Sequence, residues 1–499
     1  FDLNASRYTP SSTLQRMELL KTGYMGTLSL GWDNYLFLEL TGRQERSSTL
    51  KDQSFFYPSA NLSFLFTQAF HMPSWWNYGK LRLSYGIVGN APETYTANIV
   101  YEQGSDNGFT WNTIPSSWGN ADIRPEKKYE YEIGLESKFL NNRLGIDVSY
   151  YNNRVKDQIL STPQPSTSGV KNVLMNVGEV ANHGWDISIS ATPILTRDFR
   201  WDLTANYGVY KNKVVKLADG VPYLEILNSG GSGIKIQAVE GQPMGDIYAQ
   251  VPQVNENGEY LVSDKGLYLN QTELQKVGNI NPAGVGGLFN SFSYKNVFLD
   301  FSIDFRIGGD VINEMNQYAT AVGLTPESLK YRDTEHGGLS YYYPGDNNSS
   351  GIPVQVDPST GAGPNGEIIY HDGIILPGVV ASTGERNTRI IPAGYYYNTT
   401  YNWGTEAEQL TYRHSVFDNS YVKLRELTIG YQFPEKIISK LGLGRLSVSV
   451  FGRNLFYFYK ALKNYDAESS VGTSWANQAT VGSSTTATRS FGVSLRASF

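Results

Sequence analysis

Five histidines are the side chains in this sequence best suited to catalysis, because imidazole exchanges a proton near neutral pH. They are His71, His183, His336, His371 and His414. No Gly-x-Ser-x-Gly turn, His-Glu-x-x-His pair or Walker phosphate loop accompanies them in the sequence. With no nucleophile or metal partner at a recognised spacing, the sequence predicts a protein that is not an enzyme.

Metal and redox chemistry have equally little support. The stretch "QVDPSTGAGPNGE" contains the carboxylates Asp357 and Glu367, but their spacing does not match an EF-hand loop. The chain has no cysteine, which excludes disulfides and thiolate sites. The sequence therefore predicts no cofactor, and only a calcium ion held by the loops is left open.

Aromatic residues are the stronger candidates for binding. Flat rings stack on sugars or on peptide side chains, and Tyr and Trp also carry a polar group. They line ligand pockets together with a few polar groups. Packing between loops, or contact with a partner, is the alternative role. The candidates lie in segments rich in Gly and Asn: Trp111, Trp118, Tyr341, Tyr342, Tyr343, Tyr395, Tyr396, Tyr397 and Trp403.

In the parts of the sequence between these segments, apolar and polar residues alternate strictly, so that apolar residues fall on every second position. In "FLDFSIDFRIGG", Leu299, Phe301 and Ile303 alternate with polar residues. This alternation predicts strands with one apolar and one polar face. Several polar faces carry charges, which a core buried on both sides would not tolerate. The net charge of −6 argues against a nucleic-acid partner. No run of about 18 apolar residues predicts a membrane helix.

The connections between the strands alternate between short and long. Short turns on one side and long loops on the other are typical of an outer-membrane β-barrel. In this arrangement Phe499, the last residue, lies at the membrane interface, where aromatic rings are favourable, and serves as an assembly signal. Two connectors, 211–285 and 309–419, are long enough to predict a functional role. About thirteen strands are predicted, near 21–32, 34–45, 56–68, 79–88, 128–139, 142–152, 183–192, 199–210, 286–295, 297–308, 420–433, 445–456 and 488–499.

One predicted strand does not keep its phase. In "YVKLRELTIGYQFP", Leu427, Ile429 and Tyr431 share one face, whereas Val422 and Leu424 have the opposite phase. A β-bulge near Arg425 would bring both sets to one face. An error in the predicted start of the strand is the other explanation.

Several motifs occur in an order that resembles the SusC/RagA-type TonB-dependent outer-membrane transporters of Bacteroidota. They are "FFYPSANLSFLF" with "KLRLSYGIVGN", the Asn176, Gly178, Asn182 and Gly184 pattern of "NVGEVANHGWDISI", "GLFNSFSYKNVFLDFSI", "SYVKLRELTIGYQFP" and "GRNLFYF". The resemblance spans nearly the whole chain. Where the family usually has Asp-Pro-Glu, this sequence has Asp466-Ala467-Glu468.

The resemblance implies an all-β fold, a transmembrane barrel of about 22 strands with a plugged lumen. Only about thirteen strands are predicted here, and no plug or TonB-box is recognisable. Residues 1–499 are therefore expected to be the C-terminal portion of one barrel domain, without the N-terminal plug and the first strands.

The resemblance also implies a function. A nutrient, either a glycan or an oligopeptide, would be captured under a SusD-like lipoprotein lid and imported when TonB acts on the N-terminal region. The location would be the outer membrane, with lipid around the barrel. A passive pore or adhesion barrel without energy coupling is the alternative, and a barrel hydrolase would need a Ser, His and acid constellation on the loops.

Overall fold

The computed structural model describes residues 16–51, 53–106, 109–229, 233–345, 351–402, 411–469, 474–482 and 487–498. The predicted site residue Trp403 and the terminal Phe499 lie outside these ranges. The described residues form two compact units. The first unit contains the residues up to Ser137, Ser149–His183 and Asn212–Pro222, and the second contains Lys138–Val148, Gly184–Lys211 and the residues from Tyr223 onward.

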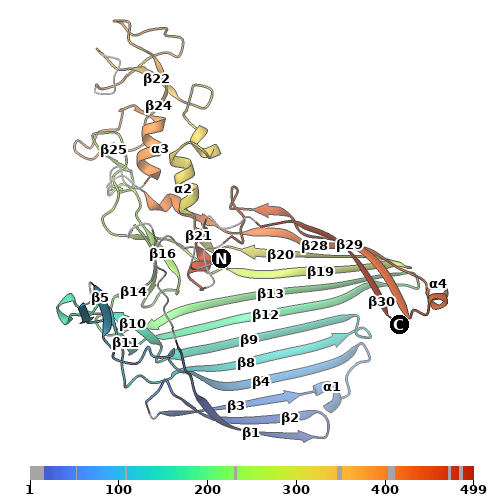
Figure 1. The fold of residues 1–499 in the computed structure, drawn as a ribbon. Coiled ribbons are helices and arrows are strands. Elements are labelled where there is room, and N and C mark those ends of the chain that lie inside the picture. The colour runs from blue at the N-terminus through green and yellow to red at the C-terminus, as the bar shows by residue number, and fades with distance from the viewer. Residues whose placement is uncertain are drawn as a thin grey trace. The chain divides into compact units, whose positions relative to one another are not determined.

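Thirteen strands form one sheet in which the spatial order follows the chain order (Figure 1). Each coincides with a strand predicted from the alternating pattern, with ends that differ by a few residues, so the prediction of strands is confirmed. The strands are β1 (Lys21–Trp32), β2 (Leu36–Ser47), β3 (Ser54–Phe64), β4 (Trp76–Asn90), β8 (Glu126–Phe139), β9 (Leu144–Lys156), β12 (Glu179–Leu195), β13 (Phe199–Lys216), β19 (Gly284–Tyr294), β20 (Val297–Ile307), β28 (Tyr421–Gln432), β29 (Arg445–Lys460) and β30 (Ser490–Ser498).

The two faces of this sheet differ in polarity. Across β20 and β28, Leu299 lies opposite Ile429 and Phe301 opposite Leu427. Apolar side chains at the end of the sheet formed by β30 stay exposed, for example Leu495 at 70%. A water-soluble protein would bury such a face, so this one needs an apolar environment.

The β-bulge predicted in β28 is present. Ser302 pairs with Glu426 and Ile303 pairs with Leu424, so Arg425 is the extra residue. A bulge residue shifts the alternation by one position. As a result, Leu424 and Leu427 both lie opposite apolar residues of β20.

The connections follow the predicted alternation. The turn between β1 and β2 places Asp33 and Asn34 at positive φ, a conformation that Asp and Asn tolerate well. Two short helices, α1 (Phe66–Ala69) and α4 (Glu435–Ile438), occupy other connectors of the short series. Among the described residues, no helix has the length and apolar character needed to cross a membrane.

The long connectors contain the buried cores. In the second unit, β14 (Tyr223–Ser229), β15 (Ile234–Val239), β16 (Asp246–Ala249) and β18 (Gln275–Asn279) form a small sheet. Its core includes Ile234, Ile236 and Ile247, all fully buried. Further along, α2 (Glu314–Ala321) and α3 (Ala393–Tyr401) accompany β22 (Leu339–Tyr342), β24 (Tyr370–Ile374) and β26 (Ile391–Pro392). The long connectors are therefore folded structures.

Candidate functional site

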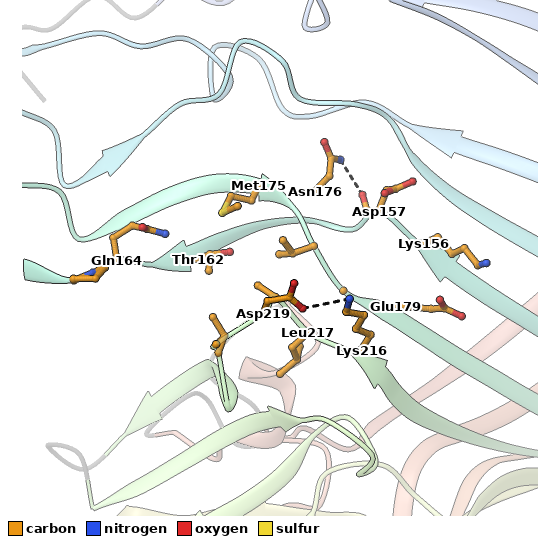
Figure 2. A pocket seen from close by; sticks show the side chains of 16 residues that line it. Lys156, Asp157, Thr162, Gln164, Met175, Asn176, Glu179, Lys216, Leu217 and Asp219 are labelled. Atoms are coloured by element: carbon orange, nitrogen blue, oxygen red, sulfur yellow. Dashed lines mark hydrogen bonds and ion pairs between the residues drawn. The ribbon is translucent and has the colours of Figure 1, made fainter. Parts of the chain in front are cut away.

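A pocket of about 760 Å³ lies in the first unit, where strands of the large sheet continue into long connectors (Figure 2). Lys156 is the last residue of β9, Glu179 is the first of β12, and Lys216 is the last of β13. All three line the pocket. A cavity of this size suits a small ligand or part of a larger one.

One wall of the pocket is a hairpin formed by β10 (Ile159–Pro163) and β11 (Asn172–Asn176). Ile159 and Leu174 lie on one face of the hairpin and pack against a buried cluster that includes Phe55. Because side chains alternate along a strand, Thr162 and Met175 lie on the other face. Both line the pocket.

Asn176 and Gly178, two residues of the sequence motif, shape this pocket. The Asn176 Nδ2 donates to the carbonyl oxygens of Arg124 at 2.7 Å and Asp157 at 3.0 Å, and its Oδ1 accepts from the Arg124 N–H at 2.6 Å. Gly178 has a φ of +93°, and a Cβ there would lie 3.5 Å from the Lys216 carbonyl oxygen. The motif therefore holds separate backbone segments together, and the structure gives it a positioning role.

The pocket contains charges of both signs, and ion pairs compensate most of them. Asp157 pairs with Arg124 at 3.2 Å, Glu179 with Arg154 at 2.9 Å, and Lys216 with Asp219 at 3.3 Å. No aromatic ring is among the described residues that line the pocket. These groups can hold a polar ligand by hydrogen bonds but offer no ring for stacking.

Thr162 is a polar group of the pocket whose bonding is incomplete. The residue is 3% exposed, and its hydroxyl has no hydrogen-bond partner within the part of the chain that the structure describes. Leaving a buried hydroxyl unpaired costs free energy. A water molecule or a ligand group in the pocket would supply the missing bond.

The aromatic residues predicted to touch a ligand are distributed over both units. In the first unit, Trp111 lies on β6 (Phe109–Thr113) and is 45% exposed, with its ring over Gly104. Trp118 is half-buried and makes an edge contact with Tyr101, with ring centroids 6.4 Å apart. Of these two, Trp111 is the more accessible to a ligand.

The Tyr341, Tyr342 and Tyr343 run is mostly buried. Tyr341 and Tyr343 are 1% and 5% exposed, and Tyr341 stacks on Tyr370 with centroids 5.5 Å apart. The Tyr341 hydroxyl donates to Asp372 at 3.1 Å, and burial raises its pKa. Tyr341 and Tyr343 therefore pack loop segments together, while Tyr342 is half-buried.

The second run, Tyr395, Tyr396 and Tyr397, lies on α3 and also contains both buried and exposed rings. Tyr397 is 7% exposed and donates to the Glu327 carbonyl oxygen at 2.7 Å, whereas Tyr395 is 38% exposed. Tyr396 packs against the cluster that contains Leu267. Tyr397 and Asp372 also line a second cavity of about 320 Å³. Both tyrosine runs therefore have a residue at or next to this cavity. Tyr397 lines it directly, and the Tyr341 hydroxyl donates a hydrogen bond to Asp372, which also lines it.

A Ser–His pair is present in the loops. The Ser340 hydroxyl lies 2.8 Å from His371 Nδ1, but Ser340 is 2% exposed. A nucleophile must be open to its substrate and needs its base oriented by a third group. No carboxylate bonds to His371 within the described residues. Ser340 is therefore closed to a substrate in this structure.

The carboxylates considered for calcium have local partners. Glu367 accepts from the Asn365 N–H at 2.8 Å and its side-chain amide at 3.1 Å, and these bonds lower its pKa to about 2. Asp357 accepts from the Ser359 N–H and hydroxyl. Across the described ranges, no group of three His, Cys, Asp or Glu side chains is arranged to hold a metal ion.

A charged cluster on the polar face of the sheet was not identified from the sequence. Arg425, the bulge residue, pairs with Asp304 at 2.5 Å and with Glu468 at 2.5 Å. Lys423, which is 1% exposed, also pairs with Glu468 at 2.5 Å. The sequence indicated the parts of this cluster separately, as a bulge near Arg425, a charge at Asp304 on a polar strand face and the Asp466-Ala467-Glu468 segment, but not that they meet.

Comparisons with known proteins found similarity to TonB-dependent receptors. A family model described as "TonB dependent receptor-like, beta-barrel" matches residues 4–243. TonB-dependent receptor P3 of Formosa agariphila is 24% identical over 90% of this chain and 42% of its own length. TonB-dependent receptor SusC of Bacteroides thetaiotaomicron is 30% identical over 46% of this chain and 24% of its own length.

Among solved structures, the RagAB peptide transporter matches with a TM-score of 0.66 and 19% identity. The match covers 94% of this chain and 47% of that one. At this identity the similarity concerns the fold. The chain spans less than half the length of these relatives.

Proposed function

Since the chain belongs to the TonB-dependent receptors of the SusC/RagA type, an outer-membrane β-barrel family, we propose that it forms the C-terminal part of the barrel of an active nutrient importer. The observation that carries this proposal is the sheet itself. Its polar face has bonded charges such as Arg425 with Asp304, and its other face has exposed apolar residues such as Leu495. A wall between lipid and a polar lumen has this division.

The proposed whole protein contains more strands and an N-terminal plug. Each edge strand of the sheet, β1 and β30, has one neighbouring strand within the described residues. A sheet in a bilayer must close, because unpaired backbone groups are costly in hydrocarbon. Additional strands between β1 and β30 would satisfy both edges, and a plug would give TonB a part to act on.

The proposed partner is a SusD-like lipoprotein that covers the long connectors. These connectors expose apolar side chains, including Val322 at 62%, Leu324 at 78% and Ile352 at 69%. Exposed apolar residues grouped on a few loops are typical of a surface that meets another protein. The accessible predicted rings, Trp111 and Tyr395, would then contact the cargo or the lid.

The cargo class is a glycan or an oligopeptide. The solved relative is a peptide transporter by its title. The described lining of the 760 Å³ pocket includes polar and charged groups, which can bond to the amides of a peptide or to the hydroxyls of a glycan.

Uptake by cells tests the proposal and separates it from the passive pore. Cells producing the full-length protein would be given fluorescent oligopeptides and oligosaccharides too large for ordinary porins. Active import predicts that uptake stops after deletion of TonB, after addition of a protonophore, and after deletion of the lid lipoprotein. Uptake that continues in all three cases would favour the passive pore.

A further inference from the structure

Lysines lie on the outer, apolar face of the sheet at the end that leads into the long connectors, and three of them, Lys127, Lys156 and Lys213, are the last on this face of their strands. On β8, Lys127 shares a face with Tyr131, Ile133 and Leu135, because these positions are separated by even numbers of residues. The three apolar residues are 44–48% exposed. The outer face of β8 therefore changes from apolar to cationic at Lys127.

Two strands that follow β8 in the sheet, β9 and β13, repeat this change. Lys156 ends β9, and its amine lies 5.9 Å from the ring centroid of Tyr129, a residue on the outer face of β8. On β13, Lys213 is in phase with Tyr207, Val209 and a further lysine, Lys211. β8, β9, β12 and β13 are consecutive neighbours in the sheet. The three lysines therefore belong to one row at the rim, with aromatic residues next to it.

The row has an excess of positive charge. Arg154, on the same face of β9, is compensated by Glu179 at 2.9 Å. Lys127, Lys156 and Lys213 have no carboxylate partner in the portion of the chain that the structure covers. Lys156 and Lys213 are exposed and Lys127 is half-buried. Uncompensated like charges in one row repel each other, so the row favours an anionic partner.

The position of the row indicates which anion it meets. The apolar face below it contacts the acyl chains of the outer membrane, and aromatic residues followed by lysines are typical of the level of lipid headgroups. A transported substrate would meet the opposite, polar face. We propose that Lys127, Lys156 and Lys213 form a docking row for the phosphate groups of anionic lipids in the outer leaflet. This inference rests on the outer-membrane location, and of the three lysines only Lys156 also lines the candidate pocket.

Lipid binding by the purified full-length protein in detergent tests the row. The probes are a bisphosphorylated lipid A and the same lipid without phosphates, and the measurement is the dissociation constant of each. The test variant is K127Q/K156Q/K213Q. The control variant is K295Q/K436Q/K440Q, because Lys295, Lys436 and Lys440 are exposed lysines on short connectors.

We expect the test variant to bind the phosphorylated lipid on the order of 100-fold more weakly, because each lysine near an anionic surface contributes about 1 kcal/mol. The control variant and the variant K127R/K156R/K213R should bind as the wild type does. The double variant K127Q/K213Q, which leaves every pocket residue in place, should show most of the loss.

Two results would overturn the proposal. The first is equal binding of the phosphorylated and dephosphorylated lipids by the wild type. The second is inhibition by inorganic phosphate at the concentration of the lipid, because it would indicate a site for free anions. Nutrient uptake by the same variants is measured separately, so the failure of lipid binding is distinguishable from the failure of the import function.

Discussion

The guanidinium of Arg425 donates to both carboxylate oxygens of Glu468, at 2.8 Å and 2.5 Å. Arg425 is the bulge residue of β28, and Glu468 lies in the connector between β29 and β30. The bulge therefore gives the sheet an extra polar side chain that ties a long connector to its polar face. Lys423 donates to the same carboxylate and is almost completely buried.

Removing this carboxylate should destabilise the protein. In Glu468→Gln, the buried ammonium of Lys423 loses its only anionic partner among the described residues. We expect a loss of about 2 kcal/mol in the free energy of unfolding. Denaturant titration in detergent would measure it. Glu426→Gln is the matched control, because the Glu426–Arg453 pair is largely exposed and should contribute less than about 1 kcal/mol.

The carboxylate of Glu468 should also make the free energy of unfolding depend on pH. Burial alone would raise the pKa of Glu468, but hydrogen bonds from Arg425 and Lys423 lower it from 4.5 to about 2. Its stabilising contribution is therefore complete above about pH 4.5 and is lost as the pH falls toward 2. The stability difference between wild type and Glu468→Gln should shrink over this range. A constant difference between pH 6 and 2.5 would contradict the assignment.

His414 should produce a second acid-sensitive step at higher pH. Its ring stacks on Tyr401 at 4.3 Å, and burial lowers its pKa to about 4. The folded protein favours the neutral ring, so stability should fall as the pH drops from 6.5 to 4 and then level off. His414→Phe keeps a flat ring and should remove this step. Unfolding curves of both proteins at a series of pH values would show it.

The two faces of the sheet should respond oppositely to an added charge. Val450 is 59% exposed on the apolar face and lies opposite Val493, whereas Ser449 lies opposite Ser494 on the polar face. Val450→Arg should cost roughly 2–4 kcal/mol of folding free energy in a bilayer. Ser449→Arg should cost little. Equal folding yields of the two variants in liposomes would contradict the assignment of the faces.

Substitution of a buried tyrosine should lower stability, whereas substitution of an exposed tyrosine should lower binding. Tyr341→Ala removes a buried ring and should cost roughly 3–5 kcal/mol of stability. Tyr395→Ala removes an exposed ring and should leave the melting temperature within a few degrees. We expect Tyr395→Ala to weaken binding of cargo or lid, measured by calorimetry. If Tyr395→Ala bound the cargo and the lid as the wild type does, Tyr395 would not belong to the proposed site.

Local patterns in the sequence were sufficient to predict the large sheet. The thirteen strands, the order of short and long connectors and the bulge near Arg425 all follow from the period of two and its single interruption. These features can be predicted from sequence because adjacent side chains in a strand point to opposite faces. The alternation of apolar and polar residues in each strand therefore shows which face meets an apolar environment and which meets a polar one.

The site depended on contacts that no local pattern encodes. The pocket brings Lys156 and Lys216 together, and Glu468 reaches Arg425 from 43 positions away. Tyr341 and Tyr395 look equivalent in sequence, yet one ring is buried and the other is exposed. The sequence alone determined the strands and the polarity of each face, because these depend on near neighbours. Only the tertiary structure decided which side chains are accessible, because burial depends on segments far apart in the chain.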